Sequence, residues 1–299
     1  MRHVLLSVVF ASSLLAQTAP DARSEPRPRS EVGRELASAL RIETADASDA
    51  ARDADAVAAG AQRLRMLQTA GRSAAAELPA ESRAAERLLD AVDAAAVVGS
   101  DQDRDRARRL AARLAEVADD LRFAPLREAP TPADWPAPAP VGDVVIKEYP
   151  AYRMATAPMR SQGDMSAFGK LFRHIQSNDI PMTAPVQMDH AAGVDREVGE
   201  RRGMSFLYED QARGQVGKAG DVEIVDVPAA IWASIGARGY ETRDSIDDLR
   251  AALLAWLRQH AARYEVVGPL RVMGWNSPSV RGDRRFYEVE LPLRLRRDV

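Results

Sequence analysis

Two patterns of hydrophobic residues divide the chain. Between residues 30 and 124 apolar residues recur at helical spacing, as in Leu110, Leu114, Val117 and Leu121, within sequence dense in Ala, Arg, Asp and Glu. Apolar residues three and four positions apart share one face of an α-helix, and this composition favours helix. We therefore predict three or four helices that fold into a small bundle or long hairpin over residues 30–124.

After Gly142 the pattern changes to short apolar runs with strand-like alternation, interrupted by two amphipathic stretches at residues 164–177 and 245–263. The run from Val144 to Ala151 resembles the run from Val222 to Ala229. Further strand-like runs follow at 180–189, 203–209, 264–276 and 285–293. This order predicts a strand–helix–strand–strand unit used twice, in an α+β domain over residues 143–295. Two helices would pack on a curved antiparallel sheet or distorted, open barrel.

Prolines crowd the segment between the two regions, residues 125–142. They stand at positions Pro125, Pro130, Pro132, Pro136, Pro138 and Pro140. Proline fixes φ and has no backbone donor, so we predict an extended, semi-rigid linker that holds the domains apart. Trp135, in its middle, is predicted to dock onto one of them.

The net charge and the absence of cysteine argue against several kinds of partner and site. The net charge is −3 with both signs mixed along the chain, which argues against a nucleic-acid partner. The absence of cysteine excludes a thiolate nucleophile, a Cys-based zinc site and covalent Cys-x-x-Cys-His haem attachment.

The N-terminus has the features of a secretory signal peptide, residues 1–22. Arg2 precedes an apolar run from Val4 to Ala16, and small residues follow. The run is too short for a stable transmembrane anchor. We expect an exported, periplasmic protein with no membrane span after cleavage; the alternative is an uncleaved N-terminal anchor.

The sequence Ile-Pro-Met-Thr-Ala-Pro-Val, from Ile180 to Val186, resembles the signature of the SOUL haem-binding family, and Met204-Ser205-Phe206 is similar to its next strand. The resemblance covers about residues 143–293. It implies a SOUL-type fold that binds haem or another tetrapyrrole in an apolar groove beside the first helix, with basic residues near the propionates. The chain departs from the family pattern at His174, usually aromatic, and at Tyr287, usually Asn.

The predicted cofactor-binding residues lie on the first helix and the strand after it. They are Phe168, Leu171, Phe172, Arg173 and Met182. An apolar face bordered by an arginine suits a flat ligand with carboxylates. Pro181 and Pro185 cannot donate ladder hydrogen bonds and indicate an edge strand or a bulge. The alternative is that both surfaces are ordinary parts of the core.

Imidazole is an available axial ligand for a haem iron. His174, at the flank of the first helix, is the first candidate, and His260, in the apolar stripe of the second, is the next. His190 lies in a polar loop and is expected to be solvated. Two alternatives stay open: a histidine on an apolar helix is often a hydrogen-bonded core residue, and tetrapyrrole can bind through apolar and propionate contacts alone.

The leading hypothesis is therefore an exported protein that binds a tetrapyrrole or another small apolar carboxylated ligand without catalysis. A second is a small-molecule hydrolase on the related effector-binding fold, with Glu148, Glu288 and Tyr287 as acid or base groups. A third is an envelope structural protein in which residues 30–124 self-associate or bind a protein; a plain spacer is the alternative for that region.

Overall fold

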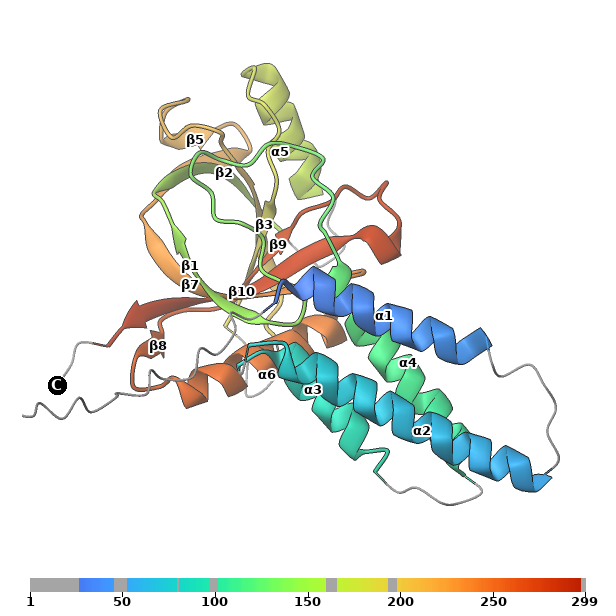
Figure 1. Ribbon diagram of the computed structural model, residues 1–299. Helices are drawn as coiled ribbons and strands as arrows, with labels where there is room; N and C mark the ends of the chain where they lie inside the picture. The colour runs from blue at the N-terminus through green and yellow to red at the C-terminus, as the bar shows by residue number, and fades with distance from the viewer. Residues whose placement is uncertain are drawn as a thin grey trace, which may run out of the picture.

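The computed structural model describes residues 27–45, 53–79, 81–96, 102–159, 166–192 and 198–296. The predicted signal peptide, residues 1–22, and the start of the first predicted amphipathic helix, residues 164–165, lie outside these residues. Figure 1 shows a helical bundle beside a strongly curled sheet, with two further helices outside the sheet. No helix among the described residues has both the length and the apolar character that crossing a bilayer requires.

The predicted helical region is present as four helices. They are α1 (Arg29–Ala45), α2 (Asp53–Ala76), α3 (Arg83–Asp93) and α4 (Asp103–Arg122). Leu64, Leu88 and Leu114 are fully buried between them. The Ser82 hydroxyl accepts a hydrogen bond from the Ala85 N–H and so caps α3. Small alanines share this core with the leucines, which lets the helices pack closely.

The C-terminal domain is α+β, as predicted. Its elements are β1 (Val144–Tyr149), β2 (Tyr152–Pro158), α5 (Ser166–Ser177), β3 (Val186–His190), β4 (Arg201–Leu207), β5 (Gly217–Ala219), β6 (Val222–Val227), β7 (Ala230–Arg238), α6 (Arg243–Gln259), β8 (Tyr264–Val266), β9 (Arg271–Gly274) and β10 (Phe286–Leu295). The strands follow the order β1-β7-β10-β9-β3-β4-β2-β6-β5, and β8 pairs with β10. Every strand pairing is antiparallel, and the sheet is curled but not closed.

Strand β10 contributes side chains to both faces of the sheet, and both faces are buried at this strand. Tyr287, Val289 and Leu291 belong to the apolar core that packs under the helices. Alternate side chains point to opposite faces of a strand, so Glu288 and Glu290 point the other way, yet both are fully buried. Helix α6 packs against β7 and β10, and α5 packs against β2, β4 and β6. One face of the sheet is therefore apolar and helix-covered, and the other is polar and closed.

Two expectations about single elements are wrong. Strand β3 is not at an edge, because it lies between β4 and β9 in the middle of the sheet; its ladder with β4 does shift register, but between Asp189 and His190 and not at the prolines. Pro181 and Pro185 precede its first residue, so neither removes a ladder bond. Helix α6 ends at Gln259 rather than at Arg263, and a turn leads directly into β8.

The proline-rich segment does not hold the two domains apart. It runs along the C-terminal domain: the Trp135 ring packs 4.6 Å from that of Tyr149 and 5.1 Å from that of Tyr152. At Gly236 of β7 the segment comes so close that a Cβ atom would lie 2.5 Å from the Ala139 carbonyl oxygen. Proline prevents helix here, but the extended chain finds its partners on the sheet instead of in solvent.

The bundle contacts the C-terminal domain through Asp143, the residue before β1. Its carboxylate accepts hydrogen bonds from the Ser82 hydroxyl at 3.1 Å and from the Ala84 N–H at 3.1 Å, and it pairs with the Arg29 guanidinium. A second contact joins Asp120 of α4 to Arg238 of β7, at 2.6 Å. The two regions are therefore joined by buried and half-buried polar contacts as well as by the chain.

Replacing Asp143 with alanine should weaken this junction. The change leaves Arg29 half-buried without its carboxylate, and we expect the free energy of unfolding to fall by about 1–3 kcal/mol. Calorimetry should then show the bundle unfolding at a lower temperature than the C-terminal domain. Asp221→Ala, at an exposed turn before β6, is the matched control and should unfold like the wild type. An Asp143→Ala variant that unfolds like this control would contradict the coupling.

Candidate functional site

The apolar face of α5 is filled by the protein itself. Leu171 and Ile175 are buried in the core against the sheet. Phe168 stacks on Phe172 at 5.9 Å and meets the Phe206 ring edge-on at 5.2 Å. Phe172 remains 39% exposed. Among the described residues, Leu171 and Ile175 thus belong to the core, and Phe172 lies on the outer surface of the helix.

The other residues predicted for this site are dispersed. Arg173 is exposed on the solvent side of α5, and Met182 is half-buried, ahead of β3 and against the core. His174 lies beside Arg173 and hydrogen-bonds the Tyr208 hydroxyl through Nε2 at 2.8 Å. Burial lowers the pKa of His174 below its ordinary value. A neutral imidazole can ligate iron, but ligation through Nε2 would have to release Tyr208, and Nδ1 lies 3.4 Å from the Asn178 side-chain nitrogen.

His260 does not lie inside the stripe of α6 and is far from α5. It is the residue after the helix end, where its Nδ1 lies 2.8 Å from the Trp256 carbonyl oxygen and its ring stacks on Trp256 at 3.7 Å. Its Nε2 faces the bundle, 3.9 Å from Glu81. Figure 1 places α5 and α6 at opposite ends of the domain, so the two candidate histidines do not share a site.

His190 is buried rather than solvated. It ends β3, is only 4% exposed, and its Nδ1 lies 2.8 Å from the Gly199 carbonyl oxygen. Burial is the largest cause that lowers the pKa of His190, and nearby Arg201 and Arg243 add to it, against Asp247. The expectation that His190 is solvated is wrong because it is based only on the polar residues that follow His190 in the sequence.

The polar face of the sheet contains a buried cluster of four charges, which we call the charge cluster: Lys147, Arg271, Glu288 and Glu290. The ammonium of Lys147 pairs with Glu288 and lies 3.8 Å from Glu290. Arg271 pairs with Glu290 at 2.8 Å, and its guanidinium lies over the Trp232 ring at 3.6 Å. Burial of an ionised group is costly unless it is paired and hydrogen-bonded, and here every charge has an opposite partner.

Glu288 is fully buried and is held by four donors of the fold, three of them on Oε1. Besides Lys147, it accepts hydrogen bonds from the Ala139 N–H at 2.5 Å, the Trp275 Nε1–H at 2.7 Å and the Ser234 hydroxyl at 3.3 Å. A carboxylate has about four acceptor sites. Burial raises the pKa of Glu288 more than Lys147 lowers it, whereas at Glu290 the charges of Arg271 and Lys147 outweigh burial and lower the pKa. The geometry fits a structural role for both.

The other residues of the hydrolase hypothesis lie elsewhere. Tyr287 points to the helix-covered face, where its hydroxyl donates to the Ser245 Oγ at 2.8 Å. Glu148 is exposed at the end of β1. The three candidate acid or base groups therefore occupy three different environments. Among the described residues no group of three or more His, Asp or Glu side chains is placed to hold a metal ion.

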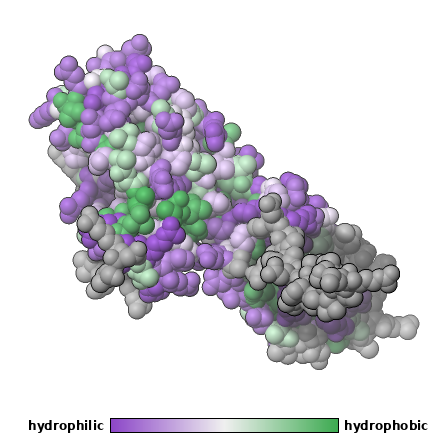
Figure 2. Space-filling view, turned by 60° about the vertical axis from the view of Figure 1, so that its left-hand side comes forward, coloured by the Kyte–Doolittle hydropathy of each residue, from purple (hydrophilic) through white to green (hydrophobic). Residues whose placement is uncertain are grey.

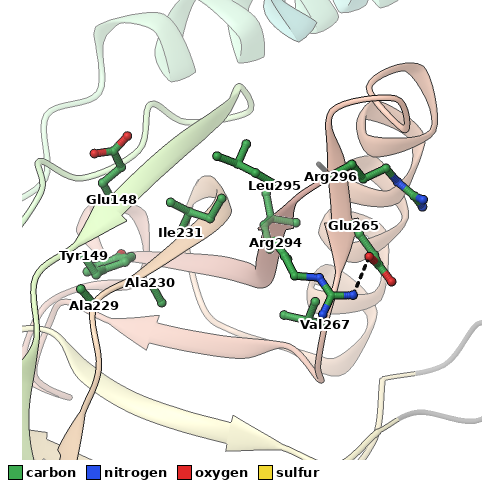
Figure 3. A pocket seen from close by; sticks show the side chains of 11 residues that line it. Glu148, Tyr149, Ala229, Ala230, Ile231, Glu265, Val267, Arg294, Leu295 and Arg296 are labelled. Carbon is green, nitrogen blue, oxygen red and sulfur yellow. Dashed lines mark hydrogen bonds and ion pairs between the residues drawn. The ribbon is translucent and has the colours of Figure 1, made fainter. Parts of the chain in front are cut away.

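An open groove lies where the strands end. Strand β10 pairs with β7 only as far as Leu293 opposite Ile231, and its last residues continue with β8 alone. The space beyond, about 1120 Å³, lies between the end of the β1–β7 pair and the end of β10 (Figure 3). Its lining is Glu148, Tyr149, Ala229, Ala230, Ile231, Glu265, Val267, Leu293, Arg294, Leu295 and Arg296. We call this space the strand-end groove.

Comparison with known families matches this domain to one of them. Residues 139–292, just over half of the chain, match the model of the SOUL heme-binding protein family. The chain belongs to the SOUL family. The match begins within the proline-rich segment, four residues before the start predicted from the sequence, and it leaves out the bundle. No curated protein matches the chain.

Solved structures similar to the SOUL domain share little sequence with it. The C-terminal domain of EcmrR is 16% identical, with a TM-score of 0.38, over 51% of this chain and 97% of that one. A hydrolase from Listeria innocua is 9% identical, with a TM-score of 0.37, over 53% and 94%. SAV2435 bound to tetraphenylphosphonium is 10% identical, with a TM-score of 0.32, over 51% and 94%. Likenesses this weak carry no information about function.

Removing one member of the charge cluster should destabilise the SOUL domain strongly. Lys147→Met leaves two buried carboxylates with only Arg271 between them, and we expect the free energy of unfolding to fall by about 3–5 kcal/mol. The double variant Lys147→Met/Glu288→Gln removes the unpaired charge and should recover much of that loss. Urea denaturation measures both. A loss under about 1 kcal/mol in the single variant would show that the cluster is not charged as described.

The burial of His190 should give the protein a pH-dependent stability. Because its pKa is lowered in the folded state, the unfolded chain takes up the proton first, and the free energy of unfolding should fall as pH drops below about 6.5. His190→Asn should show a smaller fall between pH 7.5 and 5.5, as measured by urea denaturation at each pH. Equal falls in both proteins would mean that His190 does not contribute.

Proposed function

We propose that this chain is an exported, periplasmic protein that binds a tetrapyrrole, or another flat apolar ligand with carboxylates, without catalysis of its own. Membership of the SOUL family is the observation that supports this proposal. Export is inferred from the N-terminal residues Met1–Ala19 alone. The absence of cysteine means that any haem is held without a thioether bond to the protein.

Two surfaces are candidates for the ligand. The first, predicted from the sequence, is the outer surface of α5 with Phe172, Arg173 and His174. The second is the strand-end groove, which combines apolar side chains with Arg294 and Arg296. When bound, haem brings an iron that takes axial ligands. The lining of the groove contains neither histidine nor methionine, so there the protein would hold the macrocycle through apolar and carboxylate contacts only.

The present contacts of the histidines favour binding without an axial ligand from the protein. His174 hydrogen-bonds Tyr208, and His260 is held by its contacts with Trp256 on the bundle side. Ligation by His174 through Nε2 would have to break the contact with Tyr208, and His260 does not line the strand-end groove. We therefore infer that apolar burial and arginine–carboxylate pairing provide the affinity.

A hemin titration tests this function. We expect a saturable Soret shift at about one hemin per chain, and dissociation constants for His174→Ala and His260→Ala within about threefold of the wild type, since three-fold corresponds to less than 1 kcal/mol. The Soret maximum of the bound form should be the same in all three proteins.

Two results of this titration would contradict parts of the proposal. No saturable shift in the wild type would rule out haem as a ligand. A shift that disappears only in His174→Ala would identify His174 as the axial ligand and place the site at α5, as the sequence predicted.

The other two hypotheses have less support. A hydrolase would need its acid and base groups in one site, whereas Glu288 is enclosed by its own donors and Glu148 is exposed at the end of β1. Self-association through residues 30–124 stays a prediction, because part of the bundle surface is already taken up by the SOUL domain at Asp143 and Arg238.

A further inference from the structure

Two large apolar side chains that line the strand-end groove are exposed. Val267 is 49% exposed and Leu295 is 53% exposed. Both line the groove together with Ile231 and Leu293. Exposed apolar residues are unremarkable singly, but gathered in one concave place they mark a binding surface. Figure 2 shows a surface that is largely hydrophilic, with hydrophobic residues gathered in small patches.

Both arginines that line the groove lie on one side of it, together with Glu265. In Figure 3, Arg294 and Arg296 lie on the β10 side, and Glu148 lies across the groove at the end of β1. Arg294 is paired with Glu265 at 2.8 Å, which holds its side chain against β8. A ligand with a carboxylate at one end would place that end at the arginines, because Glu148 repels it from the other side.

The size of the groove also fits a small molecule. Its volume of about 1120 Å³ is slightly above that of pockets that bury drug-sized ligands, about 300–1,000 Å³, so it has room for a larger flat molecule. The floor is built by strand ends that pair with β8 and β7, so it is formed by the sheet itself and does not depend on a rearrangement of α5.

We infer that the strand-end groove is the ligand site of this protein, and that it takes a flat apolar molecule whose carboxylate lies at Arg294 and Arg296. This inference rests on the proposed function and deepens it by assigning the site. The macrocycle would cover Val267, Leu295 and Ile231. The outer surface of α5 would not contact the ligand.

Metal-free protoporphyrin IX is the probe that tests the site, because it cannot gain affinity from an axial ligand. Its fluorescence is titrated in the wild type, in Val267→Asp and in Arg296→Glu. We expect Val267→Asp to weaken binding by about ten-fold or more, since a charge replaces apolar contact. Arg296→Glu should weaken it by about ten-fold through loss of the carboxylate contact.

Two further variants serve as controls, one with the same chemical change and one at the other candidate surface. Val216→Asp makes the same change at a valine that is 56% exposed in the loop before β5, away from the groove. Phe172→Ser removes the exposed ring of α5. Both should bind within about two-fold of the wild type. Because Val267 and Val216 are both largely exposed, near-UV circular dichroism should show native folding in either variant.

The outcomes separate the inference from the function it rests on. If the wild type shows no saturable binding of protoporphyrin IX or hemin, the proposed function is wrong and the inference fails with it. If the wild type binds and Val267→Asp binds equally well while Phe172→Ser does not, the function stands and the site assignment is wrong. A lower solution mass of Val267→Asp than of the wild type would show that the groove holds a second copy of the chain, which also overturns the inference.

Discussion

The SOUL domain is organised around two carboxylates that are buried on a central strand. Glu288 and Glu290 point to the same face of β10, and neither is exposed. Burial of two carboxylates side by side is unfavourable unless cations and donors reach both of them. Lys147 reaches them from β1, two strands away in the sheet, and Arg271 from the adjacent β9. The pairing therefore fixes the register of β1, β7, β10 and β9 together.

The same constraint explains why the proline-rich segment lies on the sheet. Glu288 needs a backbone donor, and the Ala139 N–H provides it; Trp135 covers the neighbouring tyrosines. Such contacts close the polar face, while α5 and α6 close the apolar face. The strand-end groove is different because β10 extends beyond β7 and leaves apolar side chains that no described helix or strand covers.

The sequence predicts local structure well in this chain and long-range contacts poorly. Helical spacing at Leu110 and Leu114, and alternation along β10, come from backbone geometry that acts over a few residues. The α+β class and the family follow from such patterns and from the residues Ile180–Val186. By contrast, the alternating Glu288 and Glu290 have the pattern of a strand with one solvated face. Only their distant partners, Lys147 and Arg271, show that this face is buried.

The candidate site residues also show that sequence patterns predict long-range contacts poorly. The predicted residues on α5 were found from an apolar stripe, and that stripe is also what a helix needs to pack on a sheet, so Leu171 serves the core. His190 is buried because the chain after β3 folds back over it, with the Gly199 carbonyl against Nδ1. The strand-end groove is lined by residues from the ends of β1, β7, β8 and β10, which are outside the centre of any periodic run. No local pattern marks them, and only the tertiary fold brings them together.

The bundle and the groove are connected through β1. Asp143, just before this strand, receives the contacts of Arg29 and Ser82 from the bundle, and Tyr149, its last residue, lines the groove. Between them Lys147 is buried against Glu288, so β1 cannot slip along β7 without breaking a buried ion pair. The bundle therefore helps to fix the position of one groove wall. The N-terminal helices thus contribute to the shape of the groove even though they do not line it.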